Sequence, residues 1–317
     1  MVRVSVIIVS WNTKDLLRRC LASIYASHPG LDLEVIVVDN GSSDGSLEMV
    51  ESLFPAAVAI AARENLGFAR ANNLGIARAT GDFILLINAD AELVDGALVD
   101  LVRYAQDNPD VGILGPRLLN SDGTLQSSRR RFPTAATAFM ESTVLQRWLP
   151  DHPALRAYYV LDRNDDDIQT VDWLVGACLL VRSRASRDVG PLDDGFFMYS
   201  EELDWCRRFA NHGWKVVYYP SARVIHHGGQ SSDQEPFHRH TRFQHSKCRY
   251  FERYQGPLFA ELLRIFILLN YLFMLGEDGA KWLLGSKRAM RSGRMSVLAR
   301  VIRWQLLWIA RWGRVTP

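Results

Sequence analysis

One apolar run constrains the fold of this chain more than any other feature. Residues 83–87 are five consecutive apolar residues, with Gly81-Asp82 before them and Asn88-Ala89-Asp90 after them. Such a run between turn signals predicts a short strand buried on both faces of a parallel sheet. Ligands of open α/β sheets bind beyond the carboxyl ends of such strands. An amide and a carboxylate at this spacing suit a hard divalent cation, although an Asx turn that simply ends the strand explains the same residues.

The first half of the chain alternates strand-like and helix-like patterns. Short apolar runs are separated by amphipathic stretches, the first of which follows the capping residues Asn12 and Thr13. Strands separated by helices of this length form βαβ units and pair in parallel. The predicted strands are 4–10, 33–38, 57–61, 83–87 and 111–114, and the predicted helices are 13–27, 46–54, 67–79 and 96–107.

The second half of the chain is less regular. Residues 117–125 predict a hairpin, because Asp122-Gly123 is a strong turn signal. Residues 133–170 mix proline, charged and aromatic residues, and we expect a loop-rich excursion over the acceptor side there. Beyond it we predict strands at 173–181 and 215–219, with a helix at 201–212 between them.

Two polar segments fall at the predicted ligand-binding edge. The loop 39–46 is rich in Asp, Asn, Ser and Gly, and it either cradles a nucleotide or leads into a capped helix. Its position at the end of a strand favours the nucleotide. The segment 65–73 opens a helix that contains Asn72 and Asn73, although asparagine is a poor helix former. A polar ligand explains the two asparagines, and so does a solvated helix face.

Acidic residues cluster after an aromatic approach in segment 195–205. Glu201, Glu202 and Asp204 fall within four positions. Ser200 can cap the helix that they begin, and acids in a first turn favour the helix dipole. Capping and the helix dipole account for one of the three acids and leave the other two unexplained. The aromatic run predicts a dry edge of the cleft, where the pKa of a carboxylate rises toward values suited to a general base.

A histidine pair, His226-His227, follows an apolar run near the end of the predicted sheet. A histidine in this context is usually structural. At this end of the sheet, however, a neutral His226 can meet Asp90 as a second metal ligand.

Composition limits the classes of protein that remain. With 317 residues and 48% hydrophobic content, the chain can bury one large domain plus an appendage. A formal net charge of +2 gives no reason to expect nucleic acid as a partner. The four cysteines are far apart and form no CxxC pair, so we expect them to be reduced. No secretory signal is recognisable before the first predicted strand, which favours a cytosolic setting.

The C-terminal region is basic and apolar. Residues 258–275 are almost continuously apolar, but three interior polar residues argue against a full membrane crossing. In the last predicted helix, arginines share one face, tryptophans border it and aliphatic residues lie opposite. This pattern favours a helix lying in the plane of a membrane surface over one packed on the core or in a dimer interface. In the last helix, the arginines are Arg300, Arg303, Arg311 and Arg314, and the tryptophans are Trp304, Trp308 and Trp312. The aliphatic residues opposite them are Leu298, Ile302, Leu306 and Ile309. The interior polar residues of 258–275 are Glu261, Arg264 and Asn270.

Taken together, these segments resemble the inverting family 2 glycosyltransferases, and within them the rhamnosyltransferase-like branch that extends bacterial lipid-linked glycans. The resemblance implies a GT-A fold, which is an α/β fold with a Rossmann-like, mixed but mainly parallel sheet flanked by helices. It also implies a catalytic domain over 1–232, with a nucleotide-sugar half at 1–115 and an acceptor half at 116–232. Residues 233–317 would be an amphipathic, membrane-associating helical extension. The matching segments occur in family order and are 5–12, 38–46, 65–69, 88–90, 115–131, 195–207 and 226–231.

The resemblance also implies roles for individual residues. Asp90 and His226 would hold Mg²⁺ or Mn²⁺, and Asn88 stands where the first aspartate of the family's DxD motif is usual. Glu202 would be the general base, in a catalytic group with Glu201 and with Asp204, which would orient the base or the acceptor. The nucleotide-binding residues would be Asp39, which recognises the pyrimidine base, together with Ser10, Asn12, Asn40, Ser42, Asn65, Gly67, Asn72 and Ala89.

The implied activity is a single in-line displacement on a nucleotide-activated sugar. The expected donor is dTDP-L-rhamnose, and the expected acceptor is a hydroxyl of a polyprenyl-diphosphate-linked or other glycan at the cytoplasmic face of the cell membrane. The same fold with a UDP-hexose or UDP-galactofuranose donor is the nearest alternative. Two further alternatives are a nucleotidyltransferase on a similar α/β core and a non-catalytic sugar-nucleotide-binding protein. The acidic cluster argues against the first, because a nucleotidyltransferase would not need it. The presence of Asp90, Glu202 and His226 together argues against the second.

Overall fold

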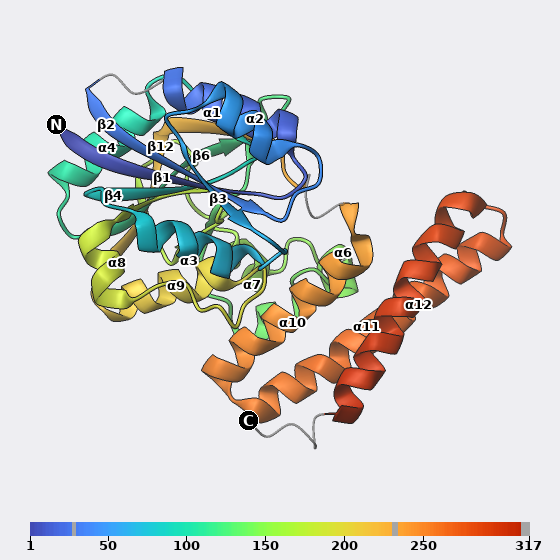
Figure 1. The fold of residues 1–317 in the computed structure, drawn as a ribbon. Helices are drawn as coiled ribbons and strands as arrows, with labels where there is room; N and C mark the ends of the chain where they lie inside the picture. Colours follow the sequence, from blue (N-terminus) through green and yellow to red (C-terminus); the bar gives the residue numbers. More distant parts are fainter. Residues whose placement is uncertain (27–29, 230–233, 312–317) are drawn as a thin grey trace. The chain divides into compact units, whose positions relative to one another are not determined.

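The computed structural model describes residues 1–26, 30–229 and 234–311, apart from the side chains of the last two (Figure 1). The chain divides into two compact units. Met1–Phe132 and Tyr159–Ser231 form the first, which we call the sheet unit, and Pro133–Tyr158 and Ser232–Pro317 form the second, the helical unit. Residues 133–158, which we expected in the acceptor half of the catalytic domain, therefore group with the C-terminal helices.

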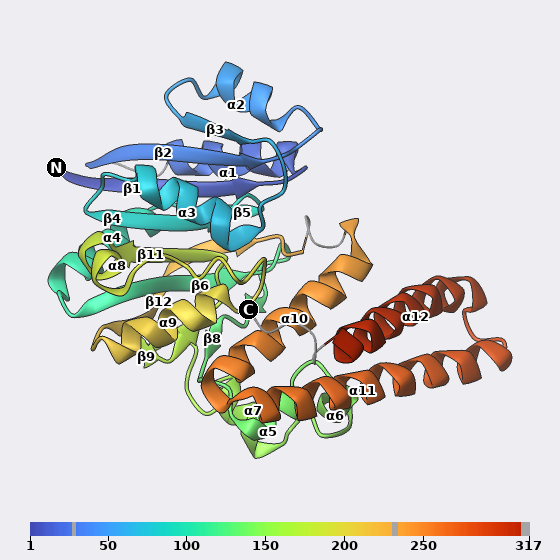
Figure 2. The same cartoon turned by 60° about the horizontal axis from the view of Figure 1, so that its bottom comes forward.

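The sheet unit is built on one mixed sheet, whose strands follow the order β3-β2-β1-β4-β11-β6-β12-β5 (Figure 2). β1 to β4 pair in parallel, and β11 lies antiparallel between β4 and β6. β12 runs parallel to β6 and antiparallel to β5 and β9. This confirms the predicted α/β class with a mainly parallel sheet. The strands are β1 Val2–Ser10, β2 Leu31–Asn40, β3 Val58–Ala62, β4 Phe83–Asn88, β5 Ala91–Leu93, β6 Val111–Leu119, β7 Leu125–Gln126, β8 Arg129–Arg130, β9 Gln169–Val171, β10 Trp173–Leu174, β11 Cys178–Arg182 and β12 Lys215–His226.

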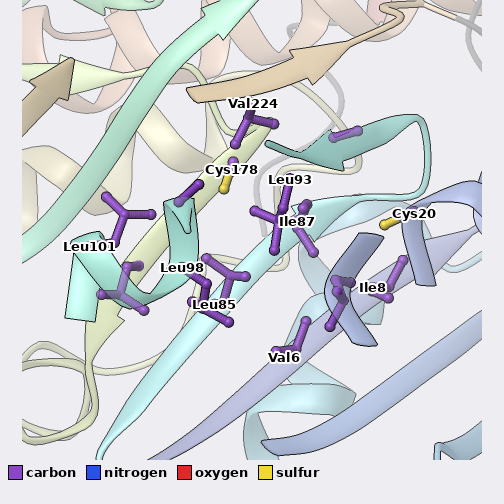
Figure 3. Close-up of a cluster of buried hydrophobic side chains, with 14 of the residues drawn as sticks. Val6, Ile8, Cys20, Leu85, Ile87, Leu93, Leu98, Leu101, Cys178 and Val224 are labelled. Carbon is purple, nitrogen blue, oxygen red and sulfur yellow. The ribbon is translucent and has the colours of Figure 1, made fainter. Parts of the chain in front are cut away.

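Helices cover both faces of this sheet, which explains why its strands read as continuous apolar runs. On one face, Val6 and Ile8 of β1 and Leu85 of β4 share a buried cluster with apolar side chains of α1, α2 and α4 (Figure 3). On the other face, Ile36 of β2 packs against Ala71 of α3. The helices of the unit are α1 Lys14–Ala26, α2 Ser46–Leu53, α3 Phe68–Arg78, α4 Ala97–Asp107, α8 Ser183–Val189 and α9 Glu201–Asn211.

The strands near the site are longer or more broken than predicted. The predicted strand 173–181 is two strands, β10 and β11, which pair with different partners. β12 continues to His226 through an irregularity between Tyr219 and Arg223. This extension pairs His226 with Ala91 of the unpredicted strand β5, and so brings the histidine to the end of β4.

The helical unit contains all the regular structure of residues 133–158, which we expected to be loop-rich. Three short helices lie there, and three long helices follow in the C-terminal region (Figure 2). The helices are α5 Ala135–Met140, α6 Val144–Trp148, α7 Pro153–Tyr158, α10 Pro236–Gln255, α11 Pro257–Leu283 and α12 Arg288–Arg311.

Three polar side chains in the apolar part of helix α11, those of Glu261, Arg264 and Asn270, are buried. Arg264 is 4% exposed, pairs with Glu261 and with Glu252 of α10, and lies over the ring of Trp308 of α12. Asn270 is also buried, and its Oδ1 accepts a hydrogen bond from the backbone of α6. By length and composition alone, α11 is the one helix of the described residues that could cross a membrane.

Helix α12 differs from the predicted membrane-facing arrangement. Leu298 and Ile302, which we expected on a lipid-facing surface, are buried, as is Val301 between them. Leu306 is exposed. The predicted positions Trp312 and Arg314, and the side chain of Arg311, lie outside the described residues. The exposed apolar surface of this unit therefore belongs mainly to α11.

Candidate active site

The carboxyl ends of β1, β2 and β4 meet at one edge of the sheet. Ser10 pairs with Asp39, and Val9 pairs with Asn88, so the polar residues that end these strands lie at the same level. This edge is where open α/β sheets bind their ligands.

Asp39 presents one carboxylate oxygen that has no hydrogen-bond donor among the described residues. The side chain is buried, its Oδ2 accepts a hydrogen bond of 3.1 Å from the backbone N–H of Ser42, and its Oδ1 is left unpaired. A buried unpaired carboxylate oxygen is costly, and it is typical of a group that meets a ligand or an ordered water. Asp39 is thus suited to accept an N–H from a ligand.

The neighbouring polar residues tie the loops after β1 and β2 together. Asn12 has a left-handed backbone (φ 51°), its N–H donates to Ser42 Oγ at 3.0 Å, and its Oδ1 accepts from the backbone of Ser43 at 2.8 Å. Ser10 Oγ lies 3.1 Å from Thr13 Oγ1. Ser10, Asn12 and Ser42 thus shape the loops at this edge of the sheet.

Asn40 and Asn65 connect the same edge to the start of α3. The amide of Asn40 donates to Asn65 Oδ1 at 3.1 Å and accepts from the N–H of Leu66 at 2.9 Å. Asn65 Oδ1 also accepts from the N–H of Gly67 at 3.0 Å. These amides therefore hold the 65–67 turn against the end of β2.

The two mid-helix asparagines have structural partners. Asn73 exchanges two hydrogen bonds with the backbone of Leu192, at 2.8 and 3.0 Å, so neither a ligand nor a solvated face explains it. Asn72 is 1% exposed and donates to the carbonyl of Phe68 at 2.9 Å. The side chain of Asn72 is therefore buried and bonded to its own helix, and its predicted contact with the nucleotide stays a prediction.

Asp90 and His226 meet as predicted. His226 Nε2 lies 3.3 Å from Asp90 Oδ1 and 3.3 Å from Asn88 Nδ2, and Ala89, between Asn88 and Asp90 in the chain, is buried. Asn88 Oδ1 is a buried atom that has no donor among the residues that the structure describes. The described residues contain no cluster of three His, Cys, Asp or Glu side chains that forms a complete metal centre. One carboxylate, one imidazole and one amide oxygen nevertheless fit a divalent ion that takes its remaining ligands from diphosphate and water.

The predicted hairpin holds both histidines, a role that the sequence did not reveal. Gln126 Oε1 lies 2.7 Å from His226 Nδ1, and Ser121 Oγ lies 2.7 Å from His227 Nδ1. His227 Nε2 lies 2.7 Å from the carboxylate of Glu92. His227 therefore spans two protein groups, whereas His226 directs one nitrogen toward Asp90.

The acidic helix α9 begins from a strained backbone. Tyr199 and Ser200 are consecutive non-glycine residues with left-handed φ values of 70° and 64°. Such residues cost about 1–3 kcal/mol each and gather at functional sites. Ser200 occupies the N-cap position, but its side chain makes no capping hydrogen bond, contrary to the simple capping explanation.

Glu202 has the surroundings of a general base. Its carboxyl group accepts from the backbone N–H groups of Gly176 and Leu203, and its Oε2 is buried without a donor among the described residues. Burial raises the pKa of Glu202, while these hydrogen bonds and the positive charge of Arg130 oppose the rise. Arg130, whose guanidinium lies 4.6 Å from the ring centre of Tyr159, is a site residue that the sequence did not single out.

The other two acids behave differently from Glu202. Glu201 is 4% exposed, and burial together with the neighbouring charge of Glu202 raises its pKa well above the ordinary value. Asp204 is fully buried and pairs with Arg208 at 2.9 Å, and Arg208 also donates to two carbonyls of the 189–191 segment. The carboxylate of Asp204 therefore anchors α9, and its predicted role in orienting the base or the acceptor stays a prediction.

Gly67 joins the 65–67 turn, at the carboxyl edge of the sheet, to the acidic segment. The N–H of Phe68 donates to the carbonyl of Phe197 at 2.6 Å. Gly67 has φ +83°, and a Cβ atom there would clash with that carbonyl and lie 2.8 Å from Cδ2 of Phe197. Only glycine permits this close approach of the two segments.

This site combines a nucleotide-type edge, a carboxylate–histidine pair and a buried acid on an adjoining helix, which defines a glycosyltransferase of the GT-A type. The Glycosyl transferase family 2 pattern matches residues 5–171. The chain belongs to this family.

Characterised relatives agree with that assignment. The chain is 31% identical over 242 residues to the N-acetylglucosaminyl-diphospho-decaprenol L-rhamnosyltransferase of Mycobacterium tuberculosis, which covers 73% of this chain and 78% of that protein. It is 24% identical over 237 residues to the low-salt glycan biosynthesis hexosyltransferase Agl10 of Haloferax volcanii, with 74% and 69% covered. The rhamnosyltransferase-like branch predicted from sequence is therefore confirmed.

A solved structure has the same fold at low identity. The mannosyltransferase PcManGT of Pyrobaculum calidifontis, in complex with GDP-Man and Mn²⁺, has a TM-score of 0.58 and 18% identity, over 99% of this chain and 88% of that one. This likeness confirms the predicted GT-A fold.

Proposed function

We propose that this enzyme transfers L-rhamnose from dTDP-L-rhamnose to a hydroxyl group of a lipid-linked glycan, with inversion at the anomeric carbon. The proposal extends the activity named for the mycobacterial relative to this chain. The observation that carries it is the buried Glu202 carboxyl with its raised pKa and its unpaired Oε2. An inverting transfer needs one such base to remove the proton of the attacking hydroxyl.

Asp90, His226 and the amide oxygen of Asn88 would hold Mg²⁺ or Mn²⁺. When bound, the ion offsets the negative charge that develops on the nucleoside diphosphate as the sugar leaves. A carboxylate, a neutral imidazole and an amide suit either ion, because both accept oxygen and nitrogen ligands and complete their shells with phosphate and water.

The chain's own residues divide the remaining tasks. Asp39 Oδ1 accepts the imide N–H of the pyrimidine base, and Glu202 takes the proton of the acceptor hydroxyl. Gly67 lets the 65–67 turn, which Asn40 holds against the end of β2, contact Phe197 in the segment before Glu202. Thymine and uracil offer the same imide N–H, so Asp39 alone does not select dTDP over UDP.

The nearest alternative is a UDP-sugar donor, such as a UDP-hexose or UDP-galactofuranose, on the same site. A non-catalytic nucleotide-sugar-binding protein is the alternative from another class. The unpaired Oε2 of Glu202 argues against the second, since a binding protein gains nothing from a costly buried acid.

We also propose that the helical unit binds the cytoplasmic face of the membrane peripherally, where a polyprenyl-linked acceptor resides. Helix α11 exposes five aliphatic side chains with 4-3-4-3 spacing, and its buried polar residues are already paired. Exposed Lys281, Lys287 and Arg288 at the turn into α12 suit anionic headgroups. The five side chains are Leu258, Leu262, Ile265, Leu269 and Leu272.

The experiment is a transfer assay with Glu202→Gln, using dTDP-L-rhamnose or UDP-sugars and a polyprenyl-diphosphate-linked acceptor. We expect the wild type to prefer the rhamnosyl donor, and Glu202→Gln to lose about 10²–10⁴-fold in kcat. Calorimetry with dTDP and Mn²⁺ should give the same affinity for both proteins. Glu51→Gln, at an exposed position of α2, is the matched control and should retain full activity.

Three outcomes would change the proposal. Preference for a UDP-sugar would leave the glycosyltransferase assignment in place and change the proposed donor from dTDP-L-rhamnose to that sugar nucleotide. Loss of nucleotide affinity in Glu202→Gln would remove its assignment as the base. Absence of binding to either nucleotide would remove the transferase function.

A further inference from the structure

We propose that Gln126 is a positioning residue that fixes the tautomer of His226, with the proton on Nδ1 and the lone pair of Nε2 directed toward Asp90. The fixed tautomer follows from the hydrogen bonds of the sheet unit alone. Its consequence for metal affinity rests on the proposed function, because it assumes that His226 is a metal ligand.

The contacts of Gln126 place its amide oxygen against the imidazole. Gln126 Oε1 lies 2.7 Å from His226 Nδ1. Gln126 Nε2 donates to Asn120 Oδ1 at 3.0 Å and to the backbone carbonyl of His226 at 3.3 Å. With both amide hydrogens facing acceptors, the oxygen of Gln126 is left to accept from His226, and Nδ1 must then carry the hydrogen.

A chain of hydrogen bonds sets the direction of each contact, starting from Asp122. The Oγ1–H of Thr124 donates to Asp122 Oδ1 at 2.6 Å, so the hydroxyl has no second hydrogen to give and can only accept from Asn120 Nδ2, at 2.9 Å. Asn120 Oδ1 therefore faces Gln126 Nε2, and Gln126 Oε1 faces His226. Hydrogen bonds to Thr124 also keep the pKa of Asp122 below its ordinary value, so this end of the chain remains an acceptor.

The opposite tautomer would make acceptor atoms face each other with no hydrogen between them. A bare Nδ1 would require Gln126 to turn its NH₂ group toward His226. Its oxygen would then face Asn120 Oδ1 and the His226 carbonyl, and no hydrogen would lie between those oxygens. Turning Asn120 as well would bring its oxygen against Thr124 Oγ1, whose hydrogen is committed to Asp122. Reversing the direction of one of these hydrogen bonds thus leaves an unfavourable contact elsewhere in the hydrogen-bonded series from Asp122 to His226.

On the other side of the ring, His226 Nε2 lies 3.3 Å from Asn88 Nδ2, a donor, and 3.3 Å from Asp90 Oδ1, an acceptor. That side is compatible with either tautomer, so the contact with Gln126 decides between them. His227 makes its own contacts with Ser121 and Glu92 and does not compete for Gln126. Residues of the 120–126 hairpin thereby determine how a histidine about one hundred positions away presents its lone pair.

The experiment is nitrogen NMR of metal-free protein carrying ¹⁵N-histidine, at about pH 8, where an ordinary imidazole is neutral. Comparison with His226→Asn identifies the His226 signals. We expect Nδ1 to be the protonated nitrogen in the wild type. Gln126→Met should shift the ring toward a mixture of tautomers, whereas Thr124→Ser, which retains the hydroxyl that directs Asn120, should keep the Nδ1–H form.

Affinity for Mn²⁺ in the presence of dTDP, measured by electron paramagnetic resonance, gives the second readout. We expect Gln126→Met to weaken it about 10–100-fold, the usual cost of losing an outer partner of a metal-binding histidine. Gln106→Met, at an exposed position of α4, is the matched control and should change neither readout. If Gln126→Met does not fold, Thr124→Val removes the directing hydroxyl instead and should also mix the tautomers.

Protonation of Nε2 in the neutral wild-type ring would overturn the inference, and so would an unchanged Nδ1–H form in both Gln126→Met and Thr124→Val. These signals require neither donor nor metal. A protein that shows the Nδ1–H form but binds no nucleotide would therefore refute the proposed function and leave the tautomer assignment standing.

Discussion

The backbone N–H of Phe68 donates a hydrogen bond of 2.6 Å to the carbonyl of Phe197, 129 positions later in the chain. This bond connects the turn before α3, at the carboxyl edge of the sheet, to the aromatic segment that precedes Glu202. It exists because Gly67 has no side chain, since a Cβ atom there would meet Phe197 directly.

We expect Gly67→Ala to separate these segments and to lose most activity. The methyl group would clash with a backbone carbonyl that cannot move cheaply, which costs about 2–3 kcal/mol in the free energy of unfolding. Gly213→Ala is a matched control, because Gly213 has φ +82° with no neighbouring atom within 4 Å. It should lose only about 1 kcal/mol and retain activity. Urea titration and the transfer assay measure both effects, and equal losses in the two variants would contradict the crowding argument.

Asp39 offers a test of base recognition. Asp39→Asn replaces a charged acceptor by a neutral amide, and a hydrogen bond to a charged group contributes about 1.5–3 kcal/mol. We therefore expect dTDP and UDP to lose at least about tenfold in affinity by calorimetry. Asp32→Asn, on the same strand but paired with Arg3 at 3.8 Å on the surface, should leave both affinities unchanged. Unaltered affinity in Asp39→Asn would show that the base is held elsewhere.

The pair of Asp204 and Arg208 should affect stability rather than chemistry. Removing one member of a buried ion pair leaves the other without compensation, which costs about 3 kcal/mol or more. We expect Asp204→Ala to lower the free energy of unfolding by this amount, while molecules that remain folded retain their kcat. Denaturant titration of the free energy of unfolding and kcat measured at low temperature provide the check. A large fall in kcat with unchanged stability would return Asp204 to the catalytic group.

Glu201 should make the protein less stable as pH rises. Its pKa is raised in the folded state, so the unfolded chain releases this proton first and binds fewer protons above the ordinary value of 4.5. The free energy of unfolding then falls with pH from that value up to the raised folded pKa. Glu201→Gln removes this loss, and in denaturant titrations we expect the variant to gain stability relative to wild type as the pH rises above the ordinary value of 4.5. Glu51→Gln should show no such gain.

Local patterns were sufficient to predict the sheet and its ligand-binding edge. The run 83–87 is apolar throughout because β4 is covered on both faces, and Asp90 follows it at the carboxyl end, as expected for a parallel strand. The meeting of Asp90 with His226 could also be anticipated, since both follow strands of the same sheet.

Other features depend on contacts that no local pattern contains. Pro220 signals the end of a strand, but an irregularity between Tyr219 and Arg223 accommodates it and lets β12 continue to His226. The partners of Asn73 and His226 lie about one hundred positions away in sequence. The helices of 133–158 are five or six residues long, too short to show a periodic pattern. By contrast, the i,i+4 spacing of Asp204 and Arg208 was a signal for their ion pair.

The exposed face of α11 gives the last prediction. Leu262 and Leu269 are 53% and 57% exposed, whereas Arg264 between them is buried and paired. A helix with its ions inward and its leucines outward is suited to contact lipid. Moving one exposed leucine side chain from water into lipid contributes about 1.5 kcal/mol or more to the free energy of binding. Each leucine should therefore raise the partition coefficient onto vesicles at least about tenfold.

We therefore expect the double variant Leu262→Ser, Leu269→Ser to lose at least about a hundredfold in partition onto vesicles that contain anionic lipid. Leu53→Ser, an equally exposed leucine of α2, should behave as wild type in flotation assays. Higher salt should weaken wild-type binding, because the nearby basic side chains interact with headgroups through screened charges. Unchanged partition of the double variant would exclude α11 as the lipid-binding face. If sedimentation showed instead that the double variant lost self-association, this face would be an interface between copies of the chain.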